Sequence, residues 1–450
     1  MPTVAFHTLG CKVNHYETEA IWQLFHKHGY ERKDFEKTAD VYVINTCTVT
    51  NTGDQKSRQV IRRAIRNNPD AVICVTGCYA QTSPAEVMSI PGVDVVVGTQ
   101  GRNKLLDYVA QYRQEREPIN GVGDIMKAKV FEEMDVPDFT DRTRASLKIQ
   151  EGCNNFCTFC VIPWARGLLR SRKPENVLRQ AQELVDAGYK EIVLTGIHTA
   201  GYGEDMENYN FARLLADMEA KVHGLKRIRI SSIEASQTTD EVVDVINRSH
   251  IIARHLHIPL QSGSDTVLKR MHRKYTTAFF ADKIASLRQA LPDFALTSDV
   301  IVGFPGETEE EFQETYDFIR QLRFSELHVF PYSQRTGTPA AKMPDQVPEE
   351  VKHERVERLI ALSNRLSEEY AEKYQDKVLE VIPEEPLNHH EPDGYYVGFS
   401  DNYLKVKFSY PSRDIVGKLV RVKLTHPGYP ISEGKFVRIL DEGEQPVTTY

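Results

Sequence analysis

Long apolar segments are absent from this sequence. Among its 450 residues the longest uninterrupted apolar run is residues 71–75, whereas a helix that spans a membrane needs about 20 such residues. The N-terminal residues lack the basic head and the apolar stretch of a secretory signal peptide. We therefore expect a cytoplasmic protein with no membrane partner.

Cysteine is scarce, and neither sign of charge dominates. Seven cysteines are too few for the disulfide framework of a secreted protein, and in a reducing compartment clustered thiols are more often metal ligands or catalysts. The 56 basic and 64 acidic side chains leave a net charge of −8. That balance argues against a chain that coats nucleic acid indiscriminately, but it permits local basic patches.

Alternating strand and helix patterns indicate the fold class. The length suggests roughly three domains of about 150 residues each. In residues 1–114 short apolar runs at 3–8, 41–46, 71–76 and 93–98 alternate with amphipathic stretches. This rhythm predicts an N-terminal domain built on an open parallel α/β sheet. Residues 115–144 lose the rhythm and are predicted to be a linker.

Two further domains are predicted after the linker. Residues 145–375 contain six strand patterns, at 146–150, 191–196, 227–233, 255–260, 295–303 and 326–332. Six β/α units fit a partial (β/α)6 barrel better than the complete eight-fold barrel. Residues 376–445 alternate in the manner of short strands separated by turns, which predicts a small all-β barrel.

Three cysteines cluster at the end of the first strand of the predicted partial barrel. Cys153, Cys157 and Cys160, called the barrel triad below, have the spacing C-x3-C-x2-C. Three thiolates can hold a four-iron cluster and leave one iron open, whereas a structural zinc ion normally takes a fourth ligand. The alternatives are three buried cysteines or a Cys3His zinc knuckle.

A second set of cysteines is dispersed along the first domain. Cys11, Cys47 and Cys78, called the N-terminal triad below, each lie just past the end of a predicted strand. Ligands of open parallel sheets bind at this edge, so the triad is a candidate for a second cluster; the alternative is three core cysteines. Cys74 lies within a strand pattern, where we expect an inert core thiol.

The pattern Cys-x3-Cys-x-Phe-Cys, with Phe159 as its aromatic residue, resembles the signature of the radical S-adenosylmethionine (SAM) enzymes. The three-cysteine domain before it and the small β-barrel after it resemble the methylthiotransferases over nearly the whole chain. Residues 7–14 (HTLGCKVN) and 162–167 (IPWARG) are similar to the branch that acts on N6-threonylcarbamoyladenosine in tRNA. The branch acting on isopentenyladenosine usually has Gln-Met-Asn at residues 12–14, and the branch that modifies a ribosomal protein departs further.

This resemblance implies two [4Fe-4S] clusters and SAM as cofactors. A cluster on the barrel triad would bind SAM through its open iron, and reductive cleavage of SAM would give a radical that takes the hydrogen from C2 of the target adenine. A cluster on the N-terminal triad would deliver the sulfur, methylated by another SAM. The protein would then supply ligation and orientation. Implied partners are tRNA, through its anticodon stem-loop with the target at position 37, a reductant protein and a sulfur donor.

Residues at the ends of the predicted barrel strands are candidates for contacts with SAM. Glycines there let a cofactor approach the backbone, and Glu234 would accept a hydrogen bond from the SAM amino group. A bare βα turn would require the same glycines, and a barrel-core valine is the alternative for Val329. The candidates are Phe159, Gly196, Glu234, Gln261, Gly303, Gly306 and Val329.

Two pairs of histidines are not predicted to bind a metal. His255 with His257 and His389 with His390 do not have a spacing that completes a metal site, so packing or solvation is favoured.

RNA contact is predicted for the C-terminal barrel, which resembles the TRAM domain and interleaves aromatic with basic residues. These are Tyr395, Tyr396, Tyr403 and Phe408 with Lys405, Lys407, Arg421 and Lys423. Basic clusters at 62–66, 166–173 and 269–274 would either flank the catalytic mouth or form solvated faces.

The function predicted from these features is methylthiolation of N6-threonylcarbamoyladenosine in tRNA. The rival enzymes are siblings that act on isopentenyladenosine or on a ribosomal protein. A rival of another class is a non-catalytic iron–sulfur or zinc sensor that binds RNA.

Overall fold

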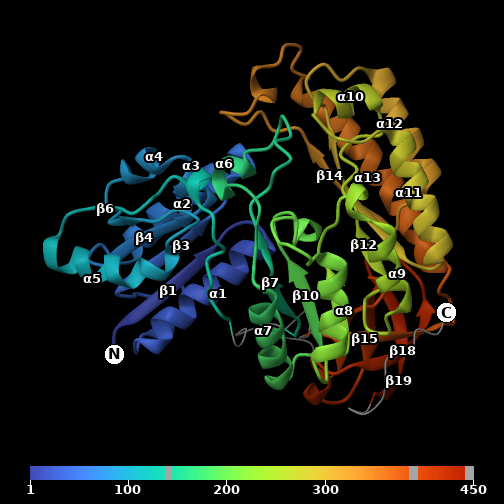
Figure 1. Ribbon diagram of the computed structural model, residues 1–450, viewed down its shortest axis with the longest axis horizontal. Helices are drawn as coiled ribbons and strands as arrows, with labels where there is room; N and C mark the ends of the chain where they lie inside the picture. The colour runs from blue at the N-terminus through green and yellow to red at the C-terminus, as the bar shows by residue number, and fades with distance from the viewer. Residues whose placement is uncertain (137–142, 385–393, 441–450) are drawn as a thin grey trace.

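The computed structural model describes residues 1–136, 143–384 and 394–440. Figure 1 shows three parts: an N-terminal α/β domain on the left, a central barrel of strands and helices, and a small β-barrel at the lower right. The fold class predicted from the sequence is confirmed. His389, His390 and the predicted domain end at residue 445 lie outside the described residues.

The N-terminal domain is built on a six-stranded sheet of order β2-β1-β3-β4-β5-β6, and every pair in it is parallel. The four predicted strands are present, although β5 is shorter than expected. The two additional edge strands, β2 and β6, are too short to leave a sequence pattern, and β6 lies past residue 114. The strands are β1 (Thr3–Thr8), β2 (Glu31–Lys33), β3 (Val41–Thr46), β4 (Val72–Gly77), β5 (Val95–Val96) and β6 (Ile119–Asn120).

Helices cover both faces of this sheet. On one face α1 (Lys12–Lys27) and α5 (Leu105–Glu115) pack against a core that includes the fully buried Cys74. On the other face lie α2 (Asn51–Asn67), α3 (Cys78–Thr82) and α4 (Pro84–Met88). Tyr16 and Ala20 of α1 also belong to the core of the central barrel, so α1 joins the two domains.

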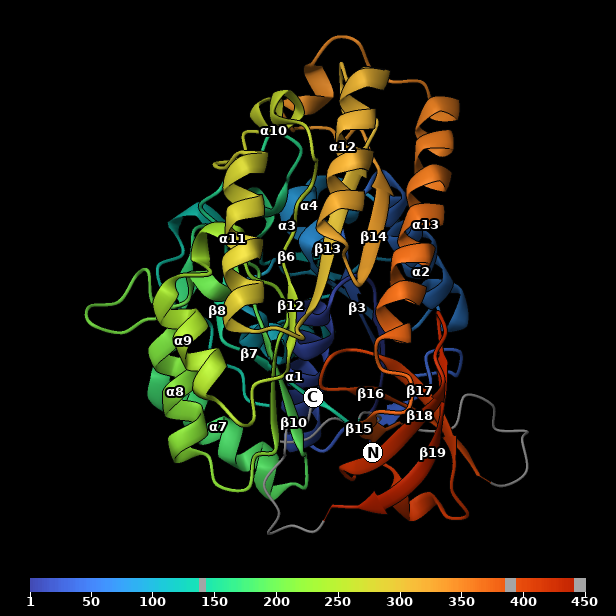
Figure 2. The same ribbon diagram turned by 90° about the vertical axis from the view of Figure 1, so that its right-hand side faces the viewer.

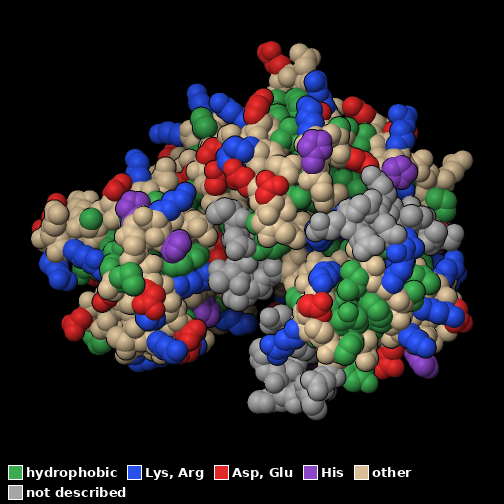
Figure 3. All heavy atoms as spheres, turned by 90° about the horizontal axis from the view of Figure 1, so that it is seen from below, with side chains coloured by type: hydrophobic (Ala, Val, Ile, Leu, Met, Phe, Trp, Pro, Cys, Tyr) green, Lys and Arg blue, Asp and Glu red, His purple; other side chains and the backbone are tan. Residues whose placement is uncertain are grey.

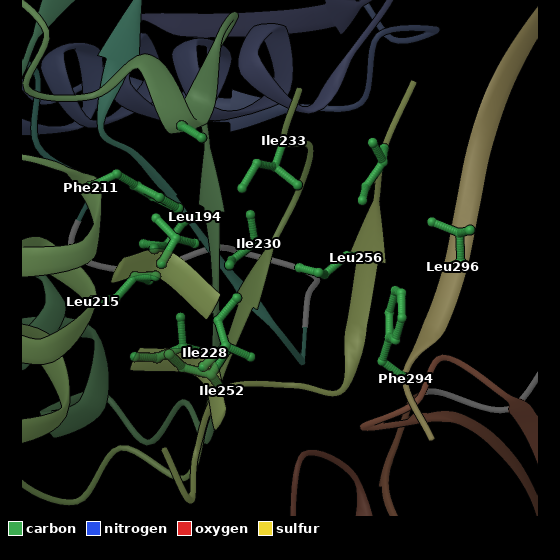
Figure 4. Close-up of a cluster of buried hydrophobic side chains, with 14 of the residues drawn as sticks. Leu194, Phe211, Leu215, Ile228, Ile230, Ile233, Ile252, Leu256, Phe294 and Leu296 are labelled. Carbon is green, nitrogen blue, oxygen red and sulfur yellow. The ribbon is translucent and has the colours of Figure 1, made fainter. Parts of the chain in front are cut away.

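The central barrel consists of parallel strands in chain order. One sheet has the order β11-β10-β7, the other β12-β13-β14, and an isolated bridge between Ile228 and Ile252 links them. Figure 4 shows part of the core, where Leu194 lies beside Phe211 and Leu215 of helix α8 (Phe211–Lys221). The strands are β7 (Ala145–Lys148), β10 (Glu191–Thr195), β11 (Arg227–Ile230), β12 (His255–His257), β13 (Ala295–Val302) and β14 (Glu326–Pro331).

Helices surround the strands of the central barrel, as Figure 2 shows. At the start of α12 Thr308 and Glu311 form a capping box. The helices are α7 (Pro174–Asp186), α8 (Phe211–Lys221), α9 (Asp240–Arg248), α10 (Asp265–Arg270), α11 (Thr277–Ala290), α12 (Glu309–Leu322) and α13 (Glu349–Glu372). Shorter elements at the cysteine loop are β8 (Gln150–Glu151), α6 (Ile162–Arg166) and β9 (Arg170–Ser171).

The C-terminal domain is a closed five-stranded barrel of order β15-β16-β17-β19-β18. Arg227 and Arg229 of the central barrel donate hydrogen bonds to backbone carbonyls of Glu380 and Ser400, so this domain is fixed to the central barrel. Its strands are β15 (Val378–Pro383), β16 (Tyr395–Ser400), β17 (Lys405–Ser409), β18 (Val420–His426) and β19 (Ser432–Ile439). Figure 3 views the molecule from below, where basic and acidic side chains are interspersed.

The predicted linker is a packed connection in the parts of it that the structure describes. Besides β6 it contains a short 3-10 helix, Ile125–Lys127, and the buried residues Phe131 and Val136. Glu132 pairs with Arg102 of the first domain at 2.9 Å. These contacts bind the connection to the domains on either side of it.

Candidate active site

A cavity of about 750 Å³ is bordered by residues of all three domains. Cys11 borders it from the N-terminal domain, the barrel triad from the central barrel, and Tyr403 from the C-terminal barrel. The fold therefore brings a cysteine of each triad to one space. A second cavity, of about 820 Å³, is bordered by described residues that include Asp54 and Trp164 but no triad cysteine.

The barrel triad lies on the loop between β8 and α6. The loop begins at Gly152, which has φ +75°, and a Cβ there would lie 2.0 Å from the backbone oxygen of Leu168. Burial raises the pKa of Cys153 to about 11 and that of Cys160 to about 12. Arg273 donates to Sγ of Cys157 at 3.4 Å. A cation is thus aimed at one sulfur of the triad.

The N-terminal triad is gathered at the carboxyl ends of β1, β3 and β4. A Cβ on Gly10 would lie 3.0 Å from Sγ of Cys47, so the turn before Cys11 lies directly against Cys47. Arg166 of α6 donates to Sγ of Cys78 at 3.2 Å. Burial, opposed by Arg166, raises the pKa of Cys78 to about 12, and Cys11 and Cys47 add to the increase.

The distances between the sulfur atoms of each triad show whether the triad fits a single metal ion or a larger cluster. In the described residues, neither triad has all three of its sulfurs within 4.8 Å of one another. A tetrahedral zinc ion with Zn–S bonds of about 2.3 Å holds its sulfurs about 3.8 Å apart. The donor sets therefore fit a larger group than a single ion, and three thiolates with adjacent guanidinium groups suit an anionic four-iron cluster.

Arg166 links the two triads through a buried ion network. Its guanidinium group is completely buried and donates to Glu17, to Asn14 and, at 3.2 Å, to Glu151. Glu17 also accepts from Lys148 at 2.7 Å. Since α6 directly follows the barrel triad and Glu17 lies on α1, this network fixes one cysteine domain against the other.

The three arginines of the basic cluster predicted at 166–173 are not surface residues. Arg166, Arg170 and Arg172 are at most 2% exposed, so the solvated-face interpretation is wrong for them, whereas Lys173 of the same cluster is exposed. Arg172 pairs with Glu133 at 2.7 Å and with Asp135 at 2.6 Å. Sequence separation of more than 30 residues hid these partners, because an unpaired run of arginines looks the same in sequence as a paired one.

Four of the seven candidate SAM contacts border the cavity: Phe159, Gly196, Glu234 and Gln261. Glu234 forms an ion pair with Arg273, a residue that the sequence analysis placed only in a basic cluster. Gln261 has φ +65°. Gly196 lies so close to Gln150 that a Cβ would be 2.9 Å from its Oε1.

Gly303, Gly306 and Val329 are not among the described residues that border this cavity. A Cβ on Gly303 would lie 2.3 Å from Lys352, and Gly306 faces Arg270. Val329 packs against the hydrophobic core of the central barrel.

The structure also adds residues that sequence reasoning missed. His198 lies 4.0 Å from Sγ of Cys153, and Arg273, Asp299 and His328 border the cavity. No sequence spacing marks them, because each comes from a different strand or loop of the barrel.

Two of the predicted RNA-binding aromatics are core residues instead. Tyr396 and Phe408 are 3% and 1% exposed and lie inside the C-terminal barrel, so that prediction is wrong for them. Tyr403 stacks on His255 with ring centroids 4.0 Å apart. Tyr395 is 50% exposed, with Nζ of Lys407 4.5 Å from its ring centroid.

The fold and the two triads define a radical SAM enzyme with an additional cysteine domain. Residues 147–319 match the Radical SAM superfamily, and residues 3–98 match the family described as Uncharacterized protein family UPF0004. The chain is 72% identical, over 98% of both chains, to the threonylcarbamoyladenosine tRNA methylthiotransferase MtaB of Bacillus subtilis (strain 168). It is 42% identical to the protein of the same name of Aquifex aeolicus (strain VF5), over 93% of this chain and 99% of that one. The chain belongs to the radical SAM methylthiotransferase family.

More distant comparisons agree with this assignment. The chain is 38% identical to the tRNA-2-methylthio-N(6)-dimethylallyladenosine synthase of Carboxydothermus hydrogenoformans, over 93% of this chain and 95% of that one. Among solved structures, the radical SAM methyltransferase TsrM of Kitasatospora setae has the same fold, with a TM-score of 0.57 at 15% identity over 76% of this chain and 77% of that one. No helix within the described ranges is long and apolar enough to cross a membrane.

Proposed function

We propose that this protein methylthiolates C2 of N6-threonylcarbamoyladenosine at position 37 of tRNA. The observation that carries the proposal is the single cavity that Cys11 of the N-terminal triad and all three cysteines of the barrel triad border. A sulfur-delivering group and a SAM-binding group would both face one substrate base there. The 72% identity to a protein named for this substrate supports the choice of base.

The residues of the chain have separate tasks in this proposal. The barrel triad would hold the [4Fe-4S] cluster that binds SAM, and the N-terminal triad would hold the second cluster. When bound, these cofactors supply the radical chemistry and the sulfur. Arg273 and Arg166 place positive charge beside Cys157 and Cys78, which compensates the negative charge of the thiolates.

The contacts with SAM are proposed for the four candidates that border the cavity. Glu234, oriented by its ion pair with Arg273, would accept a hydrogen bond from the amino group of SAM. Gly196 and Gln261 would bring the backbone of two strand ends close to the cofactor, and Phe159 would pack beside it. Gly303 and Gly306 would instead shape the turn after β13, and Val329 would support the core of the central barrel.

The C-terminal barrel is proposed to bind the anticodon stem-loop. The exposed Tyr395 and the half-buried Lys407 form an aromatic and basic pair on it, which suits stacking on a base and contact with a phosphate. A reductant protein and a sulfur donor are the other proposed partners. The proposed site of the reaction is the cytoplasm, where tRNA is available as substrate.

The experiment compares two variants in anaerobically reconstituted enzyme. An alanine cannot replace a thiolate ligand, so Cys157→Ala should abolish both deoxyadenosine formation and the methylthio product. Cys47→Ala should retain deoxyadenosine formation, because the barrel triad belongs to another domain, while the product disappears. Chromatography of deoxyadenosine and of the nucleosides of threonylcarbamoylated tRNA measures both.

Full methylthiolation by Cys47→Ala would contradict the division of labour between the triads. Product on isopentenyladenosine but not on threonylcarbamoyladenosine would show that the protein belongs with the relatives named for dimethylallyladenosine. Absence of deoxyadenosine in the wild type would favour a binding protein without turnover.

A further inference from the structure

A group of polar side chains borders the cavity besides the triads. His257 lies on β12, Asp299 on β13 and His328 on β14, and Asp299 is the direct register partner of His328. Adjacent residues of parallel strands present their side chains on the same face. One ligand atom of each of the three lies within 4.8 Å of the others. Three strands thus place two imidazoles and a carboxylate at one point of the cavity wall.

Thr297 orients two of the imidazole rings. Its Oγ1 lies 2.9 Å from Nε2 of His255 and 3.0 Å from Nδ1 of His257. Tyr403 stacks on His255 with an interplanar angle of 7°, so the C-terminal barrel holds this ring from the other side. These contacts fix the rings before any substrate arrives.

One nitrogen of His255 has no hydrogen-bond partner among the described residues. The residue is 4% exposed, borders the cavity, and its Nδ1 forms no hydrogen bond within the described part of the chain. A buried polar atom without a hydrogen-bond partner destabilises the folded protein. A ligand with a polar group at this end of the cavity would remove that cost.

The electrostatic surroundings of this group favour an anion. Burial first, and then electrostatic interactions with Arg229, His257, Lys12 and His328, lower the pKa of His255 well below its ordinary value.

The nearby carboxylates are each compensated by a basic group. Asp299 lies 3.3 Å from His257, and Glu234 pairs with Arg273. Arg229 in turn pairs with Glu191 at 2.8 Å, yet the basic groups still outweigh the acidic ones in their effect on the pKa of His255. A divalent cation would find suitable ligand types here, but it would be repelled by the surrounding basic groups.

We propose that His255 and His328 form a subsite for a carboxylate carried by the substrate base, and that Asp299, held by His257, accepts a hydrogen bond from a hydroxyl group of the same substituent. This inference rests on the proposed function, because the threonylcarbamoyl group carries both a carboxylate and a hydroxyl. The isopentenyl group carries neither, and it would leave the buried Nδ1 of His255 without a hydrogen bond. The subsite would thus set the choice of substrate within the family.

The test measures binding by the reconstituted holoenzyme to three stem-loop RNAs that differ only at position 37. They carry threonylcarbamoyladenosine, its methyl ester, which masks the carboxylate, or unmodified adenosine. A hydrogen bond to a charged group contributes about 1.5–3 kcal/mol, so the wild type should bind the free acid at least about tenfold more tightly than the ester. His328→Ala should lose that preference and keep its affinity for the ester.

The variants are chosen so that folding does not decide the result. His328 is exposed on β14, so the fold should tolerate its truncation, and His328→Gln, which keeps a donor, should retain part of the preference. The matched control is His353→Ala on α13, an exposed histidine paired with Glu357 at 3.1 Å, which should leave all three affinities unchanged.

Equal affinity of the wild type for acid and ester would overturn the subsite, as would an undiminished preference in His328→Ala. If the free-acid stem-loop is methylthiolated while His328→Ala keeps the preference, the proposed function stands and the subsite is wrong. If no stem-loop is methylthiolated, the proposed function fails, whereas the binding preference still decides the subsite. Stoichiometric zinc that is lost in His328→Ala, together with loss of the preference after chelation, would identify a metal site and overturn the anion subsite.

Discussion

Substitution of Arg166 by methionine is the most demanding test of the link between the two cysteine domains. Methionine fills a similar volume without charge. The wild-type network contains the basic groups Arg102, Lys148 and Arg166 and the acidic groups Glu17, Glu132 and Glu151. Removal of one basic group leaves a net charge of 3 − 2 = 1 negative unit among buried side chains.

The magnitude follows from the burial of this network. Removal of one partner of a buried ion pair costs about 3–5 kcal/mol, because the remaining charge is left without compensation. Arg166 is completely buried and also donates to Cys78 and Asn14, so we expect a loss near the upper end of that range. The N-terminal triad should lose iron more readily than the barrel triad, because only its Cys78 accepts from Arg166.

Urea unfolding under anaerobic conditions, followed by tryptophan fluorescence, measures the loss. The two tryptophans of the chain are well placed, since Trp22 lies on α1 and Trp164 lies on α6 beside Arg166. The matched control is Arg179→Met on α7, where Arg179 also pairs with two carboxylates, at 2.9 and 2.8 Å, but is 46% exposed. Its cost should stay below about 1 kcal/mol. A cost for Arg166→Met no larger than that of the control would refute the reasoning.

Two further predictions concern a cysteine and a buried carboxylate. Because Cys74 lies in the core, away from the strand ends, Cys74→Ser should leave about eight irons per chain by colorimetric assay; loss of half the iron would show that the N-terminal triad is wrongly assigned. Burial would raise the pKa of Glu191, but Arg229, Arg227 and Arg144 overcome it and lower the pKa to about 2. The resulting stability, about 3 kcal/mol, is present above pH 4.5 and is lost as the pH falls towards 2. Glu191→Gln should therefore flatten the fall in the urea midpoint between these pH values, and an unchanged fall would contradict it.

Features that depend on local pattern follow directly from the sequence. Short apolar runs predicted most strands of both α/β domains, because a strand that is buried on both faces is apolar over most of its length. The spacing of Cys153, Cys157 and Cys160 placed three thiols on one loop. The N-terminal triad required one further step, because cysteines after successive parallel strands must meet at the same edge of the sheet.

Only the tertiary structure decided which distant groups compensate one another. The sequence pattern favoured a surface position for Arg166 and Arg172, but both side chains are buried. Their carboxylate partners belong to the N-terminal domain and to the connecting segment, respectively, and compensate their charge. His257, Asp299 and His328 are dispersed over three strands, and no local spacing relates them until the register of the barrel aligns them. The reason is physical: desolvation, ion pairing and the lining of a cavity depend on distances in space, whereas sequence patterns report only on neighbours along the chain.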